Sequence, residues 1–566
     1  MSWYQQTTAE IARLINGQLA EPLALAADLI VPPQAELGDL SWPCFAAAKK
    51  IGQTPGALAQ DLVAKLSEVG SPLIAGWQAV GPYLNLRLNA QNVAIGVLAE
   101  IEAALVDYGR SNDGQGRRIM IEYSNANTHK EYHIGHLRNL FFGDSIQRIL
   151  NFVGYQAIPV SYLNDFGIHA AKVLWKLNQQ PINQLVPENR GYYLGQLYAQ
   201  ASQELPNDPV GQGLVGAIMK RLEAKQQPEY GRWQETRQWS VDQFNKIYSQ
   251  LNIKFEQTFF ESDYLDQGRQ LVEKMLADGR LEKSQGAVLA NLEAEKLGVL
   301  LFLRSDGTAL YPVADLPLAQ DKFNKYQLAE SWYVIDERQS LYFQQLAAVL
   351  SLLGINQPIR HLSYSFVKLP TGMMASRQGN VITYEQLKQE LLDKELAEIN
   401  SRHSDWTEEQ QQQTAWQVVV GALKFEMIKV GPEKPITFDL NQALSFDGFT
   451  AAYIQYAAVR LAAILRQTGV VDEPLDANWA LEPLEKMILL SLARFSQIVS
   501  QAGQQADPSV LAKYLFELAQ QFNDYYQRVR IIGSAEQAFR LRLAAAIRQV
   551  LINGLNLLGI NVPKVM

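Results

Sequence analysis

The chain is 566 residues long, with 48% hydrophobic and 19% charged residues, a composition typical of several globular domains and not of a disordered or fibrous protein. Its formal net charge of −8 does not indicate that the chain as a whole is a nucleic-acid binder. The single cysteine, Cys44, excludes an intramolecular disulfide, a zinc ribbon and an iron–sulfur cluster held by cysteines.

The N-terminal part of the sequence predicts an α+β domain over residues 1–110. Amphipathic helices are expected at 8–19 and 57–66, and an alternating strand at 83–88. A polar, glycine-rich linker at 109–116 ends this domain. The N-terminus has no secretion signal, and no stretch reaches the roughly 18 apolar residues of a membrane helix. We therefore expect a cytoplasmic protein with no membrane partner.

The middle of the chain predicts a parallel α/β domain over 116–390. A strand at 118–123, a helix at 135–153 and a strand at 156–162 form one βαβ unit. Gln-, Pro- and Gly-rich sequence then indicates an insertion at about 180–260. The catalytic core is expected to resume with short strands at 298–303, 331–335 and 362–367.

Beyond residue 390 the sequence has almost no strand pattern. We expect a helical connector at 391–444 and an all-α domain at 445–566. Long helices are predicted at 416–430, 450–467, 480–502, 509–530 and 535–558. Residues 509–566 hold seven Lys and Arg against three Asp and Glu. This excess indicates either ordinary helical surface charge or local binding of a polyanion.

Three of the six histidines, His129, His133 and His136, lie close together in the sequence. They could bind a metal on one helix face, or they could have purely structural roles. A third interpretation fits the position of His133-Ile134-Gly135-His136 between a strand and a helix. A helix N-terminus offers free N–H groups to phosphate, Gly135 allows close approach, and two imidazoles can stabilise a developing pentavalent phosphate.

His133-Ile134-Gly135-His136 resembles the HIGH motif of class I aminoacyl-tRNA synthetases, and Gly372 to Asn380 resembles their later KMSKS loop. The stretch from Ile121 to Asn139 is similar to the arginyl-tRNA synthetase family. Further similar stretches are 305–311 with Asp315, 333–335 with Gln339, 453–457 and 554–560. The N-terminal unit resembles that family's additional tRNA-binding domain. The resemblance therefore covers the whole chain.

This resemblance implies an α/β Rossmann-type catalytic domain, an N-terminal α+β domain and an all-α C-terminal anticodon-binding domain. The implied activity joins L-arginine to tRNA(Arg) through arginyl-adenylate, with ATP and Mg²⁺ as a substrate complex. The family generally needs bound tRNA for the first step. Neither a structural metal nor an obligate protein partner is implied.

The residues that would bind arginine can be argued from its charge. A guanidinium is always charged and prefers planar carboxylates, for which Glu122 and Asp315 are suitable, and Tyr311 can add its ring or hydroxyl. Glu122 could instead be a solvated charge, and Asp315 a helix cap. In the resembled family these three positions line the arginine side-chain pocket. The resemblance also implies arginine contacts by Asn125, Asn127, His133 and Gln339, although the family more often has a small residue at the position of Asn125.

For ATP, the resemblance implies binding by His133, Gly135, His136, Met374, Ser376 and Arg377. The implied catalytic residues are His133, His136, Lys130 and Arg377. Met373 and Ser376 replace the two lysines of the KMSKS motif. We predict that Lys130, in the loop before the HIGH helix, supplies the missing ammonium. Lys368 is a competing candidate, and Lys130 could also be a solvated loop charge.

Two further departures concern the arginine pocket: Ala314 precedes Asp315 where the family usually has Arg or Lys, and Tyr342 replaces a common His. In the tail, the candidate tRNA contacts are Tyr514, Phe522, Tyr525, Tyr526 and Arg528. Aromatic residues at helical spacing more often belong to a core, whereas exposed ones could stack on unpaired bases.

Two other functions stay open on sequence grounds. Cysteinyl-tRNA synthetase can look similar in its C-terminal helices, but it needs zinc-binding cysteines that this chain lacks. A non-catalytic tRNA-binding paralogue would have eroded motifs, whereas here the first motif is intact and the second is partly altered.

Overall fold

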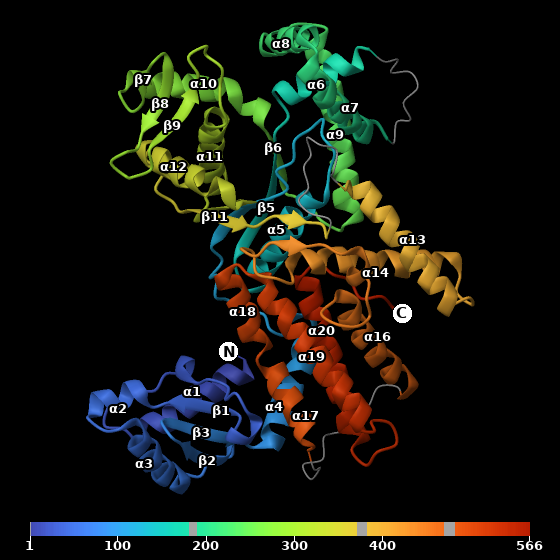
Figure 1. Ribbon diagram of the computed structural model, residues 1–566. Coiled ribbons are helices and arrows are strands. Elements are labelled where there is room, and N and C mark those ends of the chain that lie inside the picture. The colour runs from blue at the N-terminus through green and yellow to red at the C-terminus, as the bar shows by residue number, and fades with distance from the viewer. Residues whose placement is uncertain (1, 180–188, 371–381, 469–480) are drawn as a thin grey trace.

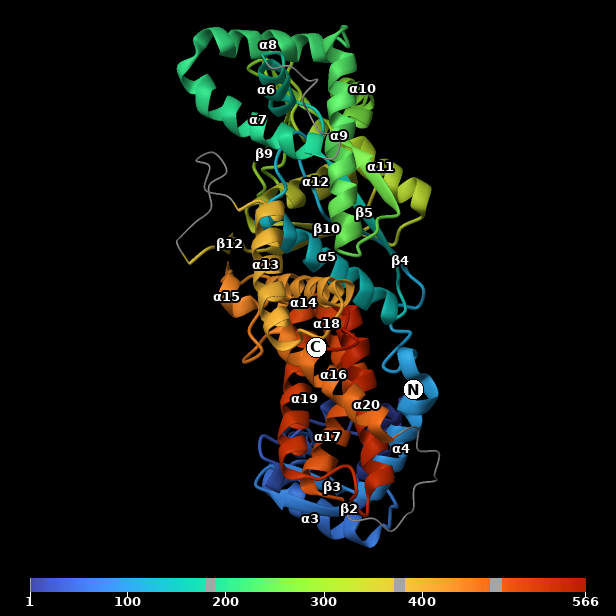
Figure 2. The same ribbon diagram turned by 90° about the vertical axis from the view of Figure 1, so that its right-hand side faces the viewer.

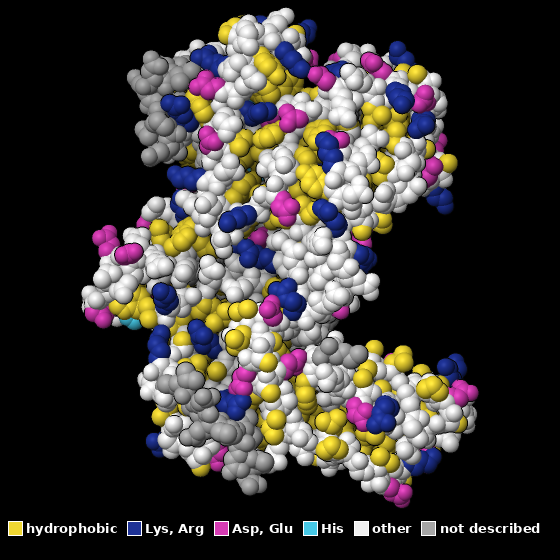
Figure 3. Space-filling view, turned by 180° about the vertical axis from the view of Figure 1, so that it is seen from behind, with side chains coloured by type: hydrophobic (Ala, Val, Ile, Leu, Met, Phe, Trp, Pro, Cys, Tyr) yellow, Lys and Arg dark blue, Asp and Glu magenta, His cyan; other side chains and the backbone are white. Residues whose placement is uncertain are grey.

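The computed structural model describes residues 2–179, 189–370, 382–468 and 481–566. The molecule is elongated: the N-terminal unit and the inserted helices lie at opposite ends, with the catalytic sheet between them (Figures 1 and 2). Seen from behind, a notch separates the N-terminal lobe from the rest, and Lys and Arg side chains are scattered over this face (Figure 3). No helix in the described ranges is long and apolar enough to cross a membrane.

The N-terminal unit is a three-stranded antiparallel sheet, in the order β1-β3-β2, covered by helices. Its strands are β1 (Leu40–Pro43), β2 (Ile74–Val80) and β3 (Tyr83–Leu88), and its helices are α1 (Trp3–Asn16), α2 (Phe45–Ile51), α3 (Pro55–Glu68) and α4 (Ala90–Ala104). Helix α1 begins earlier than predicted because Ser2 and Gln5 form a capping box with each other's backbone N–H groups.

The central domain contains a five-stranded parallel sheet in the order β11-β10-β4-β5-β6. Its strands are β4 (Arg118–Glu122), β5 (Gln156–Leu163), β6 (Gln257–Phe260), β10 (Glu330–Asp336) and β11 (Ile359–Tyr364). Strand β4 has β5, the next strand of this sheet along the chain, on one side and β10 on the other, so the order of strands reverses between β4 and β10. The carboxyl ends of β4 and β10 therefore form a topological switch point, the usual place for a ligand in such sheets.

Helix α5 (Ile134–Phe152) connects β4 to β5 and carries the HIGH motif at its start. Most of its side chains are buried. It packs against the sheet on one side and against α14 (Glu408–Ile428) and α18 (Phe495–Gln505) on the other. The predicted βαβ unit is thus present, with α5 at the centre of the molecule (Figure 1).

The prediction that the strand at 298–303 resumes the parallel core is wrong. Strand β9 (Val299–Leu303) pairs instead with β8 (Ala287–Asn291) in a separate antiparallel sheet, which β7 (Glu282–Ser284) completes. This small sheet shares its own apolar cluster with the neighbouring helices. Those helices are α10 (Glu261–Ala277), α11 (Pro312–Tyr326) and α12 (Ser340–Leu352).

Between residues 189 and 250 the predicted insertion is mainly helical, but its predicted end at about 260 is wrong, because residues 257–260 form β6 of the parallel sheet. Its helices are α7 (Arg190–Glu204), α8 (Pro209–Glu223) and α9 (Glu229–Gln250), which pack with α6 (Ile168–Leu177). Trp233, Leu174 and Val215 belong to one buried cluster. The Gln-, Pro- and Gly-rich composition of this sequence therefore did not indicate its three regular helices.

The remaining helices form an all-α region at the C-terminal end of the chain. They are α13 (Tyr384–Arg402), α14, α15 (Leu440–Ala443), α16 (Ala451–Thr468), α17 (Pro483–Ala493), α18, α19 (Pro508–Arg528) and α20 (Gln537–Leu557). Two short strands, β12 (Val367–Lys368) and β13 (Ile436–Thr437), pair in parallel. The single helix predicted at 480–502 is two helices that meet at Arg494, and α13 runs across the expected division at residue 390.

Candidate active site

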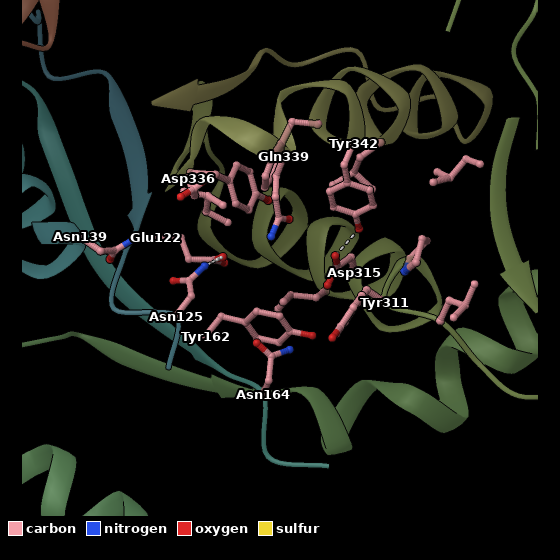
Figure 4. Close-up of a pocket in the computed structure, with 18 of the residues that line it drawn as sticks. Glu122, Asn125, Asn139, Tyr162, Asn164, Tyr311, Asp315, Asp336, Gln339 and Tyr342 are labelled. Atoms are coloured by element: carbon pink, nitrogen blue, oxygen red, sulfur yellow. Dashed lines mark hydrogen bonds between the residues drawn. The ribbon is translucent and has the colours of Figure 1, made fainter. Parts of the chain in front are cut away.

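A cavity of about 520 Å³ lies at the carboxyl ends of β4 and β10. Six of the predicted arginine-binding residues line it: Glu122, Asn125, Asn127, Tyr311, Asp315 and Gln339. They come from the end of β4, the loop after it, the start of α11 and the turn before α12 (Figure 4). The structure thus gathers residues that are more than 200 positions apart in the sequence.

Asp315 occupies the first turn of α11 and faces into the cavity. The hydroxyl of Tyr342, on α12, donates a hydrogen bond to its carboxylate. Burial raises the pKa of Asp315 to about 6, although the Tyr342 hydrogen bond acts in the opposite direction. Asp315 is therefore ionised at neutral pH and becomes neutral under mildly acidic conditions.

Glu122 is held from two sides at the end of β4. Its Oε1 accepts a hydrogen bond of 2.9 Å from Asn125 Nδ2, and its Oε2 pairs with the ammonium of Lys322. Lys322 is completely buried beneath the cavity. Burial alone would lower the pKa of Lys322, but the Glu122 carboxylate outweighs it and raises this pKa above its usual value.

The charged side chains inside the cavity leave it with a net negative charge. Among the described residues, Glu122 and Asp315 contribute two carboxylates to its interior and Lys322 one ammonium. Asp336, at the rim, already pairs with the exposed Arg338 at 2.7 Å. The interior therefore has a net charge of −1, which a single guanidinium would neutralise.

The HIGH segment presents its two imidazoles at the N-terminus of α5. His133 Nδ1 accepts from Gly135 N, and His136 Nδ1 accepts from His133 N, each at 3.1 Å. In the neutral rings the proton therefore sits on Nε2, which leaves that atom as a donor. A Cβ on residue 135 would lie 3.0 Å from the His133 ring, so glycine lets this ring fold back over the helix end.

Burial, helped by the positive charge of Lys130, lowers the pKa of His133 to about 4. Burial also lowers the pKa of His136 well below its usual value. Both rings are therefore neutral hydrogen-bond donors near pH 7. His133 is absent from the lining of the arginine cavity, so its predicted contact with arginine stays a prediction.

His129 does not join the other two histidines in a metal site. Its Nδ1 lies 2.9 Å from Thr128 Oγ1 and its Nε2 lies 2.8 Å from Thr236 Oγ1. Because both ring nitrogens have hydroxyl partners and the side chain is fully buried, His129 is a structural histidine. No trio of His, Cys, Asp or Glu able to hold a metal is found in the described ranges.

The predicted residues of the second motif, Met374, Ser376 and Arg377, lie outside the residues that the structure describes. The two candidate lysines are described. Lys130 is half-buried, with its ammonium 5.0 Å from the centre of the Tyr198 ring. Lys368 lies in the short strand β12.

Three of the tRNA contacts predicted in the tail do not fit the structure. Tyr514, Phe522 and Tyr525 are buried in the helical core, where Tyr514 donates to Ser491 O and Tyr525 donates to Glu485. A buried ring cannot stack on a base without unfolding its surroundings. Tyr526 and Arg528 are exposed and remain candidates.

The sequence interpretation missed Lys322 and Tyr162, both of which line the cavity. A signal for Lys322 was present: it lies seven positions after Asp315 on the same helix, two turns further along one face. Tyr162 lies near the end of β5, a strand that was predicted without any role in the site, and Figure 4 shows it beside Asp315.

Comparison with known proteins finds matches along nearly the whole chain. Residues 100–437 match the family model described as tRNA synthetases class I (R), catalytic domain. Residues 5–88 match the arginyl tRNA synthetase N terminal domain, and 454–566 match the DALR anticodon binding domain. An arginine–tRNA ligase of Bdellovibrio bacteriovorus is 36% identical over 555 residues, which cover 95% of this chain and 94% of the relative.

The chain belongs to the arginyl-tRNA synthetase family. Arginine–tRNA ligase 1 of Bacillus cereus is 31% identical over 576 residues, and the match covers 100% of this chain and 100% of the relative. The Thermus thermophilus arginyl-tRNA synthetase structure has a TM-score of 0.80 at 26% identity, with 99% of each chain covered. The Plasmodium falciparum arginyl-tRNA synthetase shares the fold, with a TM-score of 0.79 at 18% identity over 100% of both chains.

Two departures from the usual arginyl-tRNA synthetase pattern have structural explanations. Ala314 is fully buried in the apolar cluster that also contains Met120 and Leu318, where burial of a basic side chain would be costly. At the second, the Tyr342 hydroxyl donates a hydrogen bond to the Asp315 carboxylate.

We predict that Asp315→Asn raises the arginine KM by about 100-fold, because losing one partner of a desolvated charge pair costs several kcal/mol. The ATP KM should change far less. Steady-state pyrophosphate exchange with each substrate varied in turn measures both. Asp336→Asn at the rim is the matched control and should have a smaller effect, since Arg338 already pairs with this carboxylate. An unchanged arginine KM would exclude Asp315 from the pocket.

We also predict that kcat/KM for arginine falls as the pH drops through about 6, the pKa of Asp315. Protonation removes the charge that attracts the guanidinium, so binding is complete above this pH and is lost below it. In Tyr342→Phe the inflection should move to higher pH, because the hydrogen bond that stabilises the ionised carboxylate is gone. A profile with the same inflection in Asp315→Asn would contradict the assignment.

Proposed function

We propose that the chain activates L-arginine with ATP at this cavity and then transfers the arginyl group to the 3′ end of tRNA(Arg). The observation that carries the proposal is the anionic pocket, with Asp315 at its centre, at the switch point of a parallel sheet whose next helix presents two imidazoles. A cation-selective pocket beside a phosphate-binding helix end suits adenylation of arginine.

Arginine would enter with its guanidinium toward Asp315, which Tyr342 orients. Glu122 can accept a further hydrogen bond from the guanidinium while Lys322 holds it in place. Tyr311, at the mouth of the cavity, adds its ring. The proposed contacts of the α-amino and carboxylate groups are Asn125, Asn127, His133 and Gln339.

ATP would bind at the N-terminus of α5. Gly135 allows the phosphates to approach the backbone, and the Nε2–H groups of His133 and His136 can donate to them. Met374, Ser376 and Arg377 are the proposed contacts from the second motif. Mg²⁺ would arrive with ATP, since it binds phosphate oxygens and keeps several of its waters.

In the first step the arginine carboxylate attacks the α-phosphate, which yields arginyl-adenylate and pyrophosphate. In the second step a terminal ribose hydroxyl of tRNA attacks the arginyl carbonyl, and AMP leaves. No nucleophile from the protein is required. The protein contributes alignment of the reacting groups and neutral or cationic donors for the phosphates.

The tRNA would span the molecule. We propose an additional tRNA-binding domain at 1–110, a catalytic domain at 116–390, a connector at 391–444 and an anticodon-binding domain at 445–566. The exposed Tyr526 and Arg528 are candidates for base stacking and phosphate contact in the last of these. Since tRNA charging serves translation, the cytoplasm is the expected location.

The full chain should attach arginine to tRNA(Arg) and, with tRNA present, should exchange pyrophosphate into ATP only when arginine is added. Lysine and citrulline should support much slower exchange, because neither combines a guanidinium's charge with its planar pair of donors. Charging is measured with labelled arginine. A chain that binds tRNA but catalyses neither reaction would instead support a non-catalytic tRNA-binding protein.

We further predict that Lys130→Ala lowers kcat for exchange by about tenfold or more, equivalent to about 1.4 kcal/mol, because its ammonium would stabilise charge on the phosphates. Lys368→Ala is the matched control and should have less effect. If Lys130→Ala exchanges at the native rate, or if Lys368→Ala is damaged more, Lys130 does not replace the missing lysine of the second motif.

A further inference from the structure

The loop that carries Lys130 is anchored by the inserted helices and not by the catalytic core alone. From α9, Ser240 Oγ accepts the backbone N–H of His129 at 2.9 Å. Thr236 of the same helix lies 2.8 Å from His129 Nε2. His129, fully buried between them, has a left-handed backbone (φ 61°). These contacts hold the loop in a conformation that a solvated loop would rarely keep.

Helix α7 touches the same loop directly. A Cβ at Gly195 would lie 2.7 Å from the backbone N of Glu131, so this helix can pack here only because residue 195 is glycine. Tyr198 follows Gly195 by three positions and therefore lies on the same helix face. Its ring centre is 5.0 Å from Lys130 Nζ.

The Tyr198 ring also interacts with a second cation, Lys172 of α6, whose Nζ is 5.9 Å from its centre. The two ammonium groups repel each other, and the electron-rich face of the ring is attractive to both. Without the ring, the Lys130 ammonium would be more stable if it turned into solvent, away from the ammonium of Lys172. Lys130 is near enough to the HIGH segment to contribute to the lowered pKa of His133 and His136.

We propose that Tyr198 is a positioning residue that holds the Lys130 ammonium toward the phosphate-binding end of α5, so that α7 and α9 of the insertion serve the activation step. The inference rests on the proposed role of Lys130. It gives each of these inserted helices a definite role, since α9 fixes the loop backbone and α7 supplies the aromatic face that directs the charge.

The test measures arginine-dependent pyrophosphate exchange by the full chain with tRNA. Tyr198→Leu should lower kcat about fivefold, the worth of one cation–π contact, and leave the arginine KM unchanged. Tyr198→Phe keeps the aromatic face and should retain nearly native kcat. Tyr198→Met offers a second variant without a ring if the leucine variant folds poorly. Tyr192→Leu, on the same helix, is the matched control and should behave as the native chain.

A double-mutant cycle separates positioning from mere packing. If Tyr198 acts through Lys130, adding Tyr198→Leu to Lys130→Ala should cause no further loss. An equal loss in both backgrounds, or a damaged Tyr198→Phe, would overturn the inference. A native exchange rate in Tyr198→Leu, together with an impaired Lys130→Ala, would also overturn the inference about Tyr198 but would leave the proposed role of Lys130 intact. A native exchange rate in Lys130→Ala would overturn both the role of Lys130 and the inference about Tyr198.

Discussion

The architecture depends on one constraint: α5 must present a polar first turn to the site while burying almost every other side chain. Its charged residues therefore need partners inside the protein. Arg138 donates to the carbonyls of Met427, Gly431 and Pro432, and Asp144 accepts from Arg148 at 2.9 Å and lies 3.6 Å from Lys424. Most of these partners belong to α14 and the turn after it. The helix that begins with the HIGH motif is thus held in place by the all-α region.

Much of the catalytic centre could be predicted because its signals are local. The apolar strand that ends at Glu122, the loop after it and the HIGH segment follow one another in the sequence, and all three occupy the predicted positions. Asp315 could be proposed from charge and motif. Its partner Tyr342 could not, since their contact joins two helices whose mutual orientation depends on packing. Lys322 was missed because a lone Lys in a helix normally indicates an exposed position.

Elsewhere, periodicity showed which helices form but not which of their faces is covered. Helix α19 is amphipathic, yet Tyr514, Phe522 and Tyr525 bury their rings while Tyr526, the very next residue, is exposed. The break at Arg494 between α17 and α18 has no Pro or Gly to mark it. Strand β9 has the composition of a core strand, and only pairing with β8 places it in another sheet. These features depend on long-range contacts.

The buried Lys424 has a consequence for how the protein is made. Its ammonium donates to the carbonyl of Gly559 at 2.7 Å, near the end of the chain, and burial lowers the pKa of Lys424 to about 8. Before the segment after α20 is in place, Lys424 has the Asp144 carboxylate 3.6 Å away but not the shorter contact with the Gly559 carbonyl, so α14 should pack beneath α5 less firmly. Domains usually mature in the order of their synthesis. Here the Lys424 contact with Gly559 can form only after both segments have been synthesised, although the catalytic domain is made earlier.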